Sequence, residues 1–209
     1  MTLRLDPLSV VVGGCLEFRV PLSFADRAFA SLKQSIAHTA GNVQPIKVRS
    51  ADEARWELVF GARRLRACLE LGLPVAAVAE DLTALAAFTQ LDASNDDSHV
   101  SVYERGRLYR AALDSGYFPS SRRLAQAVGR ALSDVQQALA TVELSSDVVK
   151  HLKDPRALTP ATARRLAAAV SVDPDAATAR MASLTGKQLM TGRELLQLLQ
   201  PHSARISRG

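Results

Sequence analysis

The sequence predicts an α+β N-terminal domain followed by an all-α domain, from two features of its patterning. Short β-branched segments alternate with helical segments only before about residue 95, and beyond that point the apolar residues recur with helical spacing. Aromatic residues are 5 % of the 209 residues, while alanine and leucine are abundant, which favours helix over sheet. We expect domains at 1–95 and 96–170, with further helices and a basic, disordered tail at 171–209.

The first domain is predicted to contain a small mixed sheet. The segments with strand character are Leu8–Val12, Cys15–Val20, Pro45–Arg49, Trp56–Phe60 and PVAAVAED at 74–81. The first two segments should form a hairpin around Gly13 and Gly14. The third and fourth are expected to pair with each other, because only a short polar turn separates them.

Three helices are expected in the same domain, beginning near Ser23, Gly61 and Leu82. The first has an apolar face and stops at Gly41. In the second, we expect Leu65, Cys68 and Leu69 to face the core. Short amphipathic helices should follow from Tyr103, interrupted by glycine, proline and serine residues, and residues 171–200 should hold two more helical stretches.

The charge is unevenly distributed. Residues 1–100 hold 10 basic and 12 acidic side chains, a balance of −2, and residues 101–209 hold 16 and 9, a balance of +7. The second half is therefore the one expected to face a polyanion. No apolar run approaches the ~20 residues of a membrane span, and we expect no signal peptide, no zinc site at Cys15 or Cys68 and a cytoplasmic location.

The segment Ser121–Leu144 has the spacing of a helix-turn-helix motif. Ala125 supplies the small residue of the first helix, Gly129 suits the turn, and Val135 is placed to anchor the second helix. A plain helical hairpin with a glycine turn has the same pattern, and the basic excess favours the DNA-binding interpretation.

A helix-turn-helix would present two sets of side chains to DNA. The second helix would offer base-reading residues, since Gln can pair bidentately with adenine, and flanking arginines would meet phosphates. The candidates are Arg122, Arg123 and Arg130 for phosphates, and Ser133, Asp134, Gln136 and Gln137 on the second helix.

Gly61 lies between a strand and a helix rich in arginine. The free amides at such a helix N-terminus attract anions. Arg63, Arg64 and Arg66 add guanidinium groups that can bind phosphate bidentately. The pattern indicates a phosphate site, with a merely solvated basic face as the alternative. No catalytic triad, metal cluster or paired carboxylates stand out, and Glu104 is interpreted as a helix-capping residue.

Three sequence segments together resemble those of ParB-type partition proteins. GNVQPIKVR followed by WELVFGARRLRACLELGL and a buried strand is similar to their N-terminal domain. SNDDSHVSVYERGRLYRAAL resembles a later motif of the family, an Asn-containing turn before a helix. The resemblance covers about residues 8–170, is greatest to the plasmid-type branch, and implies a ParB/sulfiredoxin-like N-terminal fold.

In that family the N-terminal domain is a CTP-binding switch that closes a clamp once the helix-turn-helix has found an inverted-repeat centromere. The resemblance implies CTP and Mg²⁺ as ligands. The implied contacts are Gly61, Arg63 and Arg64 to the triphosphate, Gln44, Pro45 and Ile46 near the base, and Asn95 near the phosphates and Mg²⁺.

The sequence departs from the family at two places. Ala62 stands where many members have Glu, and Ser94–Ser98 lacks the usual Glu and Arg of the later motif. Asp96 and Asp97 are interpreted as a solvated Asx turn in preference to a metal site. CTP binding is therefore expected without appreciable hydrolysis.

The resemblance also implies partners: double-stranded DNA, a second copy of the chain in a homodimer, and a ParA-type ATPase whose contact segment is not evident. Leu195, Leu196, Leu198 and Leu199 form a stripe that could pair two chains, although packing within its own chain is favoured. The alternatives are a transcriptional regulator on the same scaffold and an enzyme related to sulfiredoxins and free-serine kinases.

Overall fold

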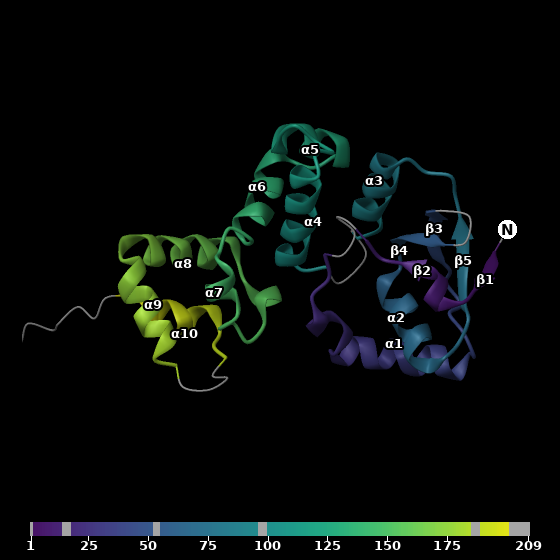
Figure 1. Cartoon of the computed structure of the whole chain (residues 1–209), viewed down its shortest axis with the longest axis horizontal. Coiled ribbons are helices and arrows are strands. Elements are labelled where there is room, and N and C mark those ends of the chain that lie inside the picture. The colour runs from purple at the N-terminus through teal and green to yellow at the C-terminus, as the bar shows by residue number, and fades with distance from the viewer. Residues whose placement is uncertain (1, 14–17, 52–54, 96–99, 185–188, 201–209) are drawn as a thin grey trace, which may run out of the picture. The chain divides into compact units, whose positions relative to one another are not determined.

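The computed structural model describes residues 2–13, 18–51, 55–95, 100–184 and 189–200. The chain forms two compact units (Figure 1). The N-terminal unit comprises residues 1–100 and 108–132, and the C-terminal unit comprises 101–107 and 133–209. Helix α4 (Val102–Asp114) contributes residues to both units.

A five-stranded mixed sheet forms the centre of the N-terminal unit. Its strands are β1 (Leu3–Leu5), β2 (Val10–Val11), β3 (Ile46–Ser50), β4 (Trp56–Phe60) and β5 (Val75–Ala79). They lie in the order β1-β5-β3-β4-β2. The outer pair β1–β5 and the central pair β3–β4 are antiparallel, and β3–β5 and β2–β4 are parallel. The predicted pairing of the third and fourth segments is thus confirmed.

The described part of residues 8–20 does not form the predicted N-terminal hairpin. Pro7 begins a 3-10 turn, η1 (Pro7–Ser9), which the Asp6 side chain caps, so that only Val10–Val11 of the expected strand is extended. β2 pairs with β4 in parallel, with Val10 opposite Trp56, and residues 18–20 are not in a strand. Residues 14–17 lie outside the described residues. Strand β1, which precedes Pro7, was not predicted.

Helices α1 and α2 cover one face of the sheet (Figure 1). The helices of this unit are η3 (Pro21–Phe24), α1 (Arg27–His38), α2 (Ala62–Leu71), α3 (Ala84–Ser94) and α5 (Ser121–Val128). The ion pairs Asp26–Arg63 and Lys33–Glu70 each join residues 37 apart in sequence. The constant offset means that α1 and α2 run side by side in the same direction.

The core beneath these two helices is formed by alternate strand residues and one helix face. Ile46, Val48 and Val75 are fully buried there, together with Ala67 and Cys68 of α2. Leu65 is buried as predicted, but Leu69 is 40 % exposed and the expectation for it is wrong. The buried residues of α2 are Leu65, Ala67 and Cys68, and the helical period places Leu69 at the edge of the face that they form.

The opposite face of the sheet is covered at β4. Leu58 belongs to the core under α1 and α2, and the next residue, Val59, is also buried although its side chain points to the other face. Helix α3 packs against β4 and contacts α5. Phe88 of α3 meets Phe118 edge-on, with ring centroids 5.3 Å apart.

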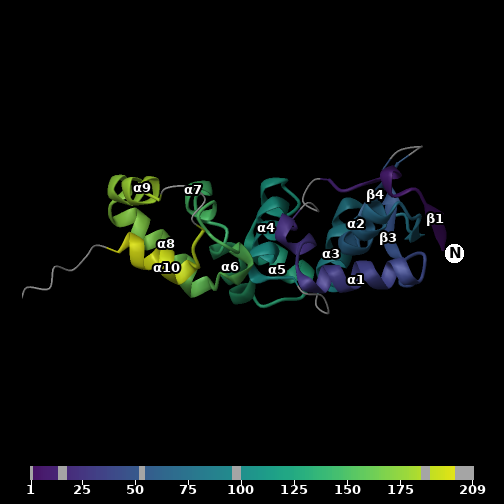
Figure 2. The ribbon, with the colours of Figure 1, turned by 90° about the horizontal axis from the view of Figure 1, so that it is seen from below.

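The C-terminal unit is helical among its described residues, apart from an isolated bridge between Leu152 and Met190. Its elements are α6 (Leu132–Ala140), α7 (Ser146–Val149), η4 (Pro155–Ala157), α8 (Pro160–Val172), α9 (Pro174–Ala182) and α10 (Gly192–Leu199). Helices α8, α9 and α10 pack together (Figure 2). A capping box of Thr191 and Glu194 starts α10.

The leucine stripe of α10 is buried within its own chain. Leu195, Leu196 and Leu199 are at most 5 % exposed, and α10 makes its contacts with α8 and α9. The favoured expectation for this stripe is confirmed. The basic tail at 201–209 lies outside the described residues. In the part of the chain that the structure describes, no helix has the length and apolar character of a membrane span.

Candidate functional site

The junction between β4 and α2 is a glycine turn that leaves a helix N-terminus open. Gly61 has φ 102° and ψ 25° and caps α2 without a side-chain hydrogen bond. A Cβ there would lie 2.7 Å from Cγ2 of the fully buried Ile46. Only glycine fits this close approach and this φ. The first amides of α2 therefore have no capping side chain and form an anion-binding end.

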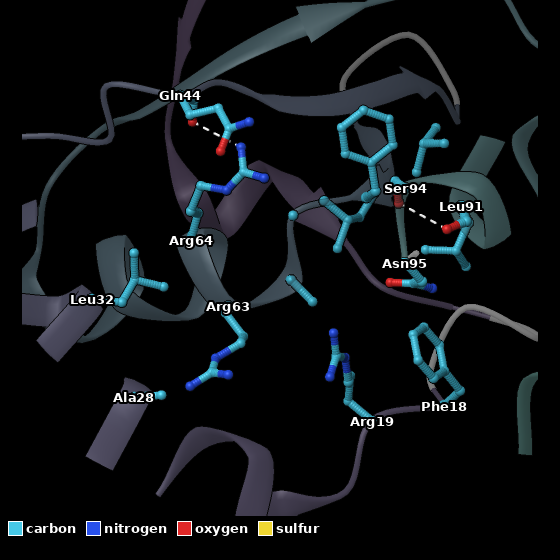
Figure 3. A pocket seen from close by; sticks show the side chains of 15 residues that line it. Phe18, Arg19, Ala28, Leu32, Gln44, Arg63, Arg64, Leu91, Ser94 and Asn95 are labelled. Carbon is cyan, nitrogen blue, oxygen red and sulfur yellow. Dashed lines mark hydrogen bonds between the residues drawn. The ribbon is translucent and has the colours of Figure 1, made fainter. Parts of the chain in front are cut away.

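This N-terminus opens into a cavity of about 560 Å³ within the N-terminal unit (Figure 3). Residues from β4, α2, α1 and the end of α3 line the cavity. They are Phe18, Arg19, Ala28, Leu32, Gln44, Leu58, Val59, Phe60, Gly61, Ala62, Arg63, Arg64, Leu91, Ser94 and Asn95. The lining is apolar on the sheet side and carries three arginines.

The cavity brings together five of the eight residues predicted to hold a nucleotide: Gln44, Gly61, Arg63, Arg64 and Asn95. The other three do not line it. Ile46 is buried beneath Gly61, and Pro45 contributes its backbone carbonyl to Arg64. Arg66 lies three residues further along α2, half exposed, with its Nε 2.7 Å from Glu70 Oε1.

Arg63 is held in place at the cavity by residues of α1. Its Nη2 donates to Oδ1 of Asp26 over 2.6 Å, and its guanidinium carbon lies 5.8 Å from the ring centroid of Phe29. Asp26 is at the same time the N-cap of α1, accepting from the Phe29 amide at 2.8 Å. The Nε of Arg63 is buried and has no hydrogen-bond partner among the described residues, so a donor remains for a bound anion.

Arg64 has a different role in the same cavity. Its Nη1 donates to the backbone carbonyls of Gln44 and Pro45, at 2.9 and 2.5 Å. Burial lowers the pKa of the Arg64 guanidinium below its usual value. Figure 3 shows Arg64 turned toward Gln44 and Arg63 turned the opposite way, with Arg19 and Asn95 beyond the start of α2. Arg64 therefore fixes the segment that enters β3.

The lining also contains residues that were not predicted, among them Phe18, Arg19, Leu91 and Ser94. The guanidinium carbon of Arg19 lies 5.4 Å from the ring centroid of Phe18. These two residues belong to the segment Cys15–Val20, whose strand-like alternation gave no sign of a binding role. Ser94 directly precedes the predicted Asn95, and its hydroxyl donates to the Leu91 carbonyl at 2.8 Å.

The candidate DNA-binding residues occupy two short helices. Helix α5 begins at the Ser120 cap and ends at Gly129, which has φ 67°. Arg122 and Arg123 are exposed on α5. On α6, Val135 and Ala138 are buried, whereas the residues predicted to read bases are exposed: Ser133, Asp134, Gln136 and Gln137.

Arg130 differs from the other candidate phosphate contacts. Its Nε donates to Oδ2 of the buried Asp92 over 2.8 Å, and its side chain is 17 % exposed. Asp92 also accepts from the Tyr109 hydroxyl at 2.9 Å. The structure therefore gives Arg130 a partner inside the N-terminal unit.

Comparisons with known proteins find a family match for the first domain and similar folds among solved structures. Residues 9–90 match the model of the ParB N-terminal domain. No curated protein matches the chain. Among solved structures, the Pnob8-like ParB-N domain is 14 % identical, with a TM-score of 0.53 over 96 % of this chain and 98 % of that one. This likeness shows the fold of an N-terminal α/β domain followed by a helical part.

Two structures of the C-terminally truncated chromosome-partitioning protein ParB from Caulobacter crescentus also match. The complex with CTP-gamma-S is 19 % identical, with a TM-score of 0.40 over 94 % of this chain and 99 % of that chain. The complex with the centromeric parS site is 24 % identical, with a TM-score of 0.47 over 94 % and 98 %.

Proposed function

We propose that the chain is a DNA-binding partition protein of the ParB type, because residues 9–90 match the ParB N-terminal domain. It would recognise an inverted-repeat centromere as a homodimer, act with a ParA-type ATPase, and associate with nucleoid or plasmid DNA. The observation that carries the proposal is the cavity at Gly61, where five predicted nucleotide ligands meet, four of them within the matched residues 9–90.

The cavity suits CTP through its charge and its donors. The open amides of α2 and the guanidinium groups of Arg63 and Arg19 would hold the triphosphate. The segment at Gln44, fixed by Arg64, would lie toward the base, and Asn95 would complete the site. The described lining contains no carboxylate that could act as a general base, so we propose binding without appreciable hydrolysis.

The two helices around Gly129 support the DNA-binding part of the proposal. Helix α6 is polar on its exposed side, where Gln136 and Gln137 would read base edges. Arg122 and Arg123 of α5 would contact phosphates. Two copies of this motif in a dimer would match the two half-sites of an inverted repeat, and CTP would gate the closing of a clamp around the DNA.

A direct test is isothermal titration of the full chain with CTP. Arg63→Met should weaken CTP binding about tenfold or more, because a charge-assisted hydrogen bond is lost. The matched control is Arg27→Met, since Arg27 is exposed on α1 and does not line the cavity. Equal affinities for both variants, or no binding of CTP by the parent protein, would contradict the proposal.

A transcriptional regulator built on the same two parts is the second candidate, favoured by the same exposed face of α6. Genome-wide occupancy separates the two functions: a strong peak with broad flanking spread indicates a partition clamp, and isolated promoter peaks indicate a regulator. The sulfiredoxin-like alternative is opposed by Cys68. That thiol is fully buried outside the cavity, and burial raises its pKa, which disfavours the reactive thiolate.

A further inference from the structure

The charged side chains among the described lining residues of the cavity are all positive. Arg19, Arg63 and Arg64 line it, and none of its described lining residues is Asp or Glu. Ala62 occupies the first position of α2, so the helix start contributes no carboxylate either. The positive end of the α2 dipole adds to the same sign.

The donor set does not suit a protein-bound Mg²⁺. Magnesium in nucleotide sites is held by one or two carboxylates together with the phosphates. The nearby carboxylate of Asp26 already accepts from both Arg63 and the Phe29 amide through Oδ1. Asn95 and Ser94 supply neutral oxygens. No group of three His, Cys, Asp or Glu side chains that could hold a metal occurs among the described residues.

We propose that this site takes the nucleoside triphosphate as the metal-free anion, with guanidinium groups neutralising the phosphates in place of a divalent ion. The inference rests on the proposed function and specifies the form in which its nucleotide ligand binds. A planar guanidinium can bind two phosphate oxygens and keeps its charge at any physiological pH. Arg63, with a buried Nε lacking a partner among the described residues, and Arg19 are the groups placed to do this.

The main test is the affinity of the full chain for CTP in excess EDTA and in excess Mg²⁺. We expect the two dissociation constants to differ by less than about fivefold, which corresponds to about 1 kcal/mol. A larger loss of affinity in EDTA overturns the proposal. The absence of CTP binding in both buffers contradicts the proposed function itself, and this inference with it.

A variant at Arg19 tests whether a guanidinium group takes the place of Mg²⁺ at the phosphates. Arg19→Met should bind CTP about tenfold more weakly in EDTA, and Mg²⁺ should restore part of the affinity by replacing the missing charge. A purely structural loss would be the same in both buffers, and that outcome contradicts the assigned role. Arg27→Met is the control and should match the parent in both buffers.

A further variant tests whether carboxylates hold a metal ion after all. The acidic pair Asp96–Asp97 lies outside the described residues and is the pair to replace. The double variant Asp96→Asn/Asp97→Asn should bind CTP like the parent in both buffers. If it instead loses affinity in Mg²⁺ but not in EDTA, these carboxylates hold the ion and the proposal is overturned.

Discussion

Three arginines at the start of α2 have different roles despite their closeness in sequence. Arg63 lines the cavity and pairs with Asp26, Arg64 holds two backbone carbonyls, and Arg66 pairs with Glu70 away from the cavity. The helical period turns Arg64 about 100° away from Arg63, and Arg66 lies about one turn further from the open N-terminus. The charge of a residue near a helix start therefore does not decide whether it can reach a ligand; its direction and its distance from the N-terminus do.

Gly61 provides the first prediction at the scale of a residue. Gly61→Ala should lower the free energy of unfolding by about 3 kcal/mol, because the φ is strained for alanine and the new Cβ meets buried Ile46 at 2.7 Å. Gly72→Ala is the control, with φ 64° and open space around it, and should cost about 1 kcal/mol. Urea unfolding measures both, and equal costs would contradict the packing argument.

At the scale of an element, α3 connects the cavity with the helices that follow. Its last turn supplies Leu91, Ser94 and Asn95 to the lining. Asp92, between them in sequence, points away from the cavity and binds Tyr109 and Arg130. One helix thus contacts the candidate nucleotide site on one side and a buried polar network on the other.

The Arg130–Asp92 pair gives the second prediction. Arg130→Met should lower stability by about 3 kcal/mol, because the carboxylate of Asp92 would stay buried without its counter-charge. Arg122→Met, at an exposed position of α5, should leave stability unchanged. Adding Asp92→Asn to Arg130→Met should recover part of the loss in thermal denaturation. A double variant less stable than Arg130→Met would show that the charge is not the cause.

The close packing of α4 with α6 in the C-terminal unit gives the third prediction. A Cβ at Gly106 would lie 2.2 Å from the Ala138 carbonyl oxygen, and backbone cannot move aside. Gly106→Ala should therefore destabilise the unit by about 3 kcal/mol.

Gly192 of α10 is the matched control for this substitution. Its nearest neighbours are the side-chain ends of Thr162 and Leu158, at 3.0 and 3.2 Å, which can shift. Gly192→Ala should cost less than about 1 kcal/mol, because alanine also favours the helix. Chemical unfolding that ranks the two variants in the opposite order would contradict the prediction.

At the scale of the whole molecule, the distribution of charge along the sequence matches the sizes of the two proposed ligands, a nucleotide and a DNA duplex. The first half carries −2 overall, although three of its eight arginines line a small cavity, and the second half carries +7. A nucleotide needs only a local cluster of positive charge, whereas a DNA duplex is attracted by the charge of an extended surface.

The fourth prediction concerns DNA specificity. Gln136→Ala/Gln137→Ala should lower the ratio of specific to non-specific affinity about tenfold or more, because base-edge hydrogen bonds are lost. Gln197→Ala, exposed on α10, should leave this ratio unchanged. Fluorescence anisotropy with the duplex found by genome-wide occupancy, and with a scrambled duplex, measures it. An equal loss for both duplexes would show that these glutamines do not read bases.

The fifth prediction concerns phosphate contacts. Arg122→Met should weaken binding to both duplexes similarly and reduce the slope of log affinity against log salt by about 1. The measurement is a salt titration of each duplex. An unchanged slope would remove Arg122 from the phosphate contacts.

Much of the fold could be predicted from local pattern. The strand Trp56–Phe60 and the helix between Gly61 and Gly72 lie where expected, because alternation and flanking glycines are properties of neighbouring residues. The described part of residues 8–20 does not form the expected hairpin, because pairing is decided between distant segments and β2 pairs with β4.

Local preferences along the chain were enough to predict the class of the domains, the glycine turn before α2 and the residue types at the candidate sites. Which side chains share the cavity depends on the fold. In the folded chain Arg19 lines the cavity, Arg66 does not, and Arg130 has a buried partner. A binding site depends on side-chain direction and on packing between segments distant in sequence, and local patterns encode neither.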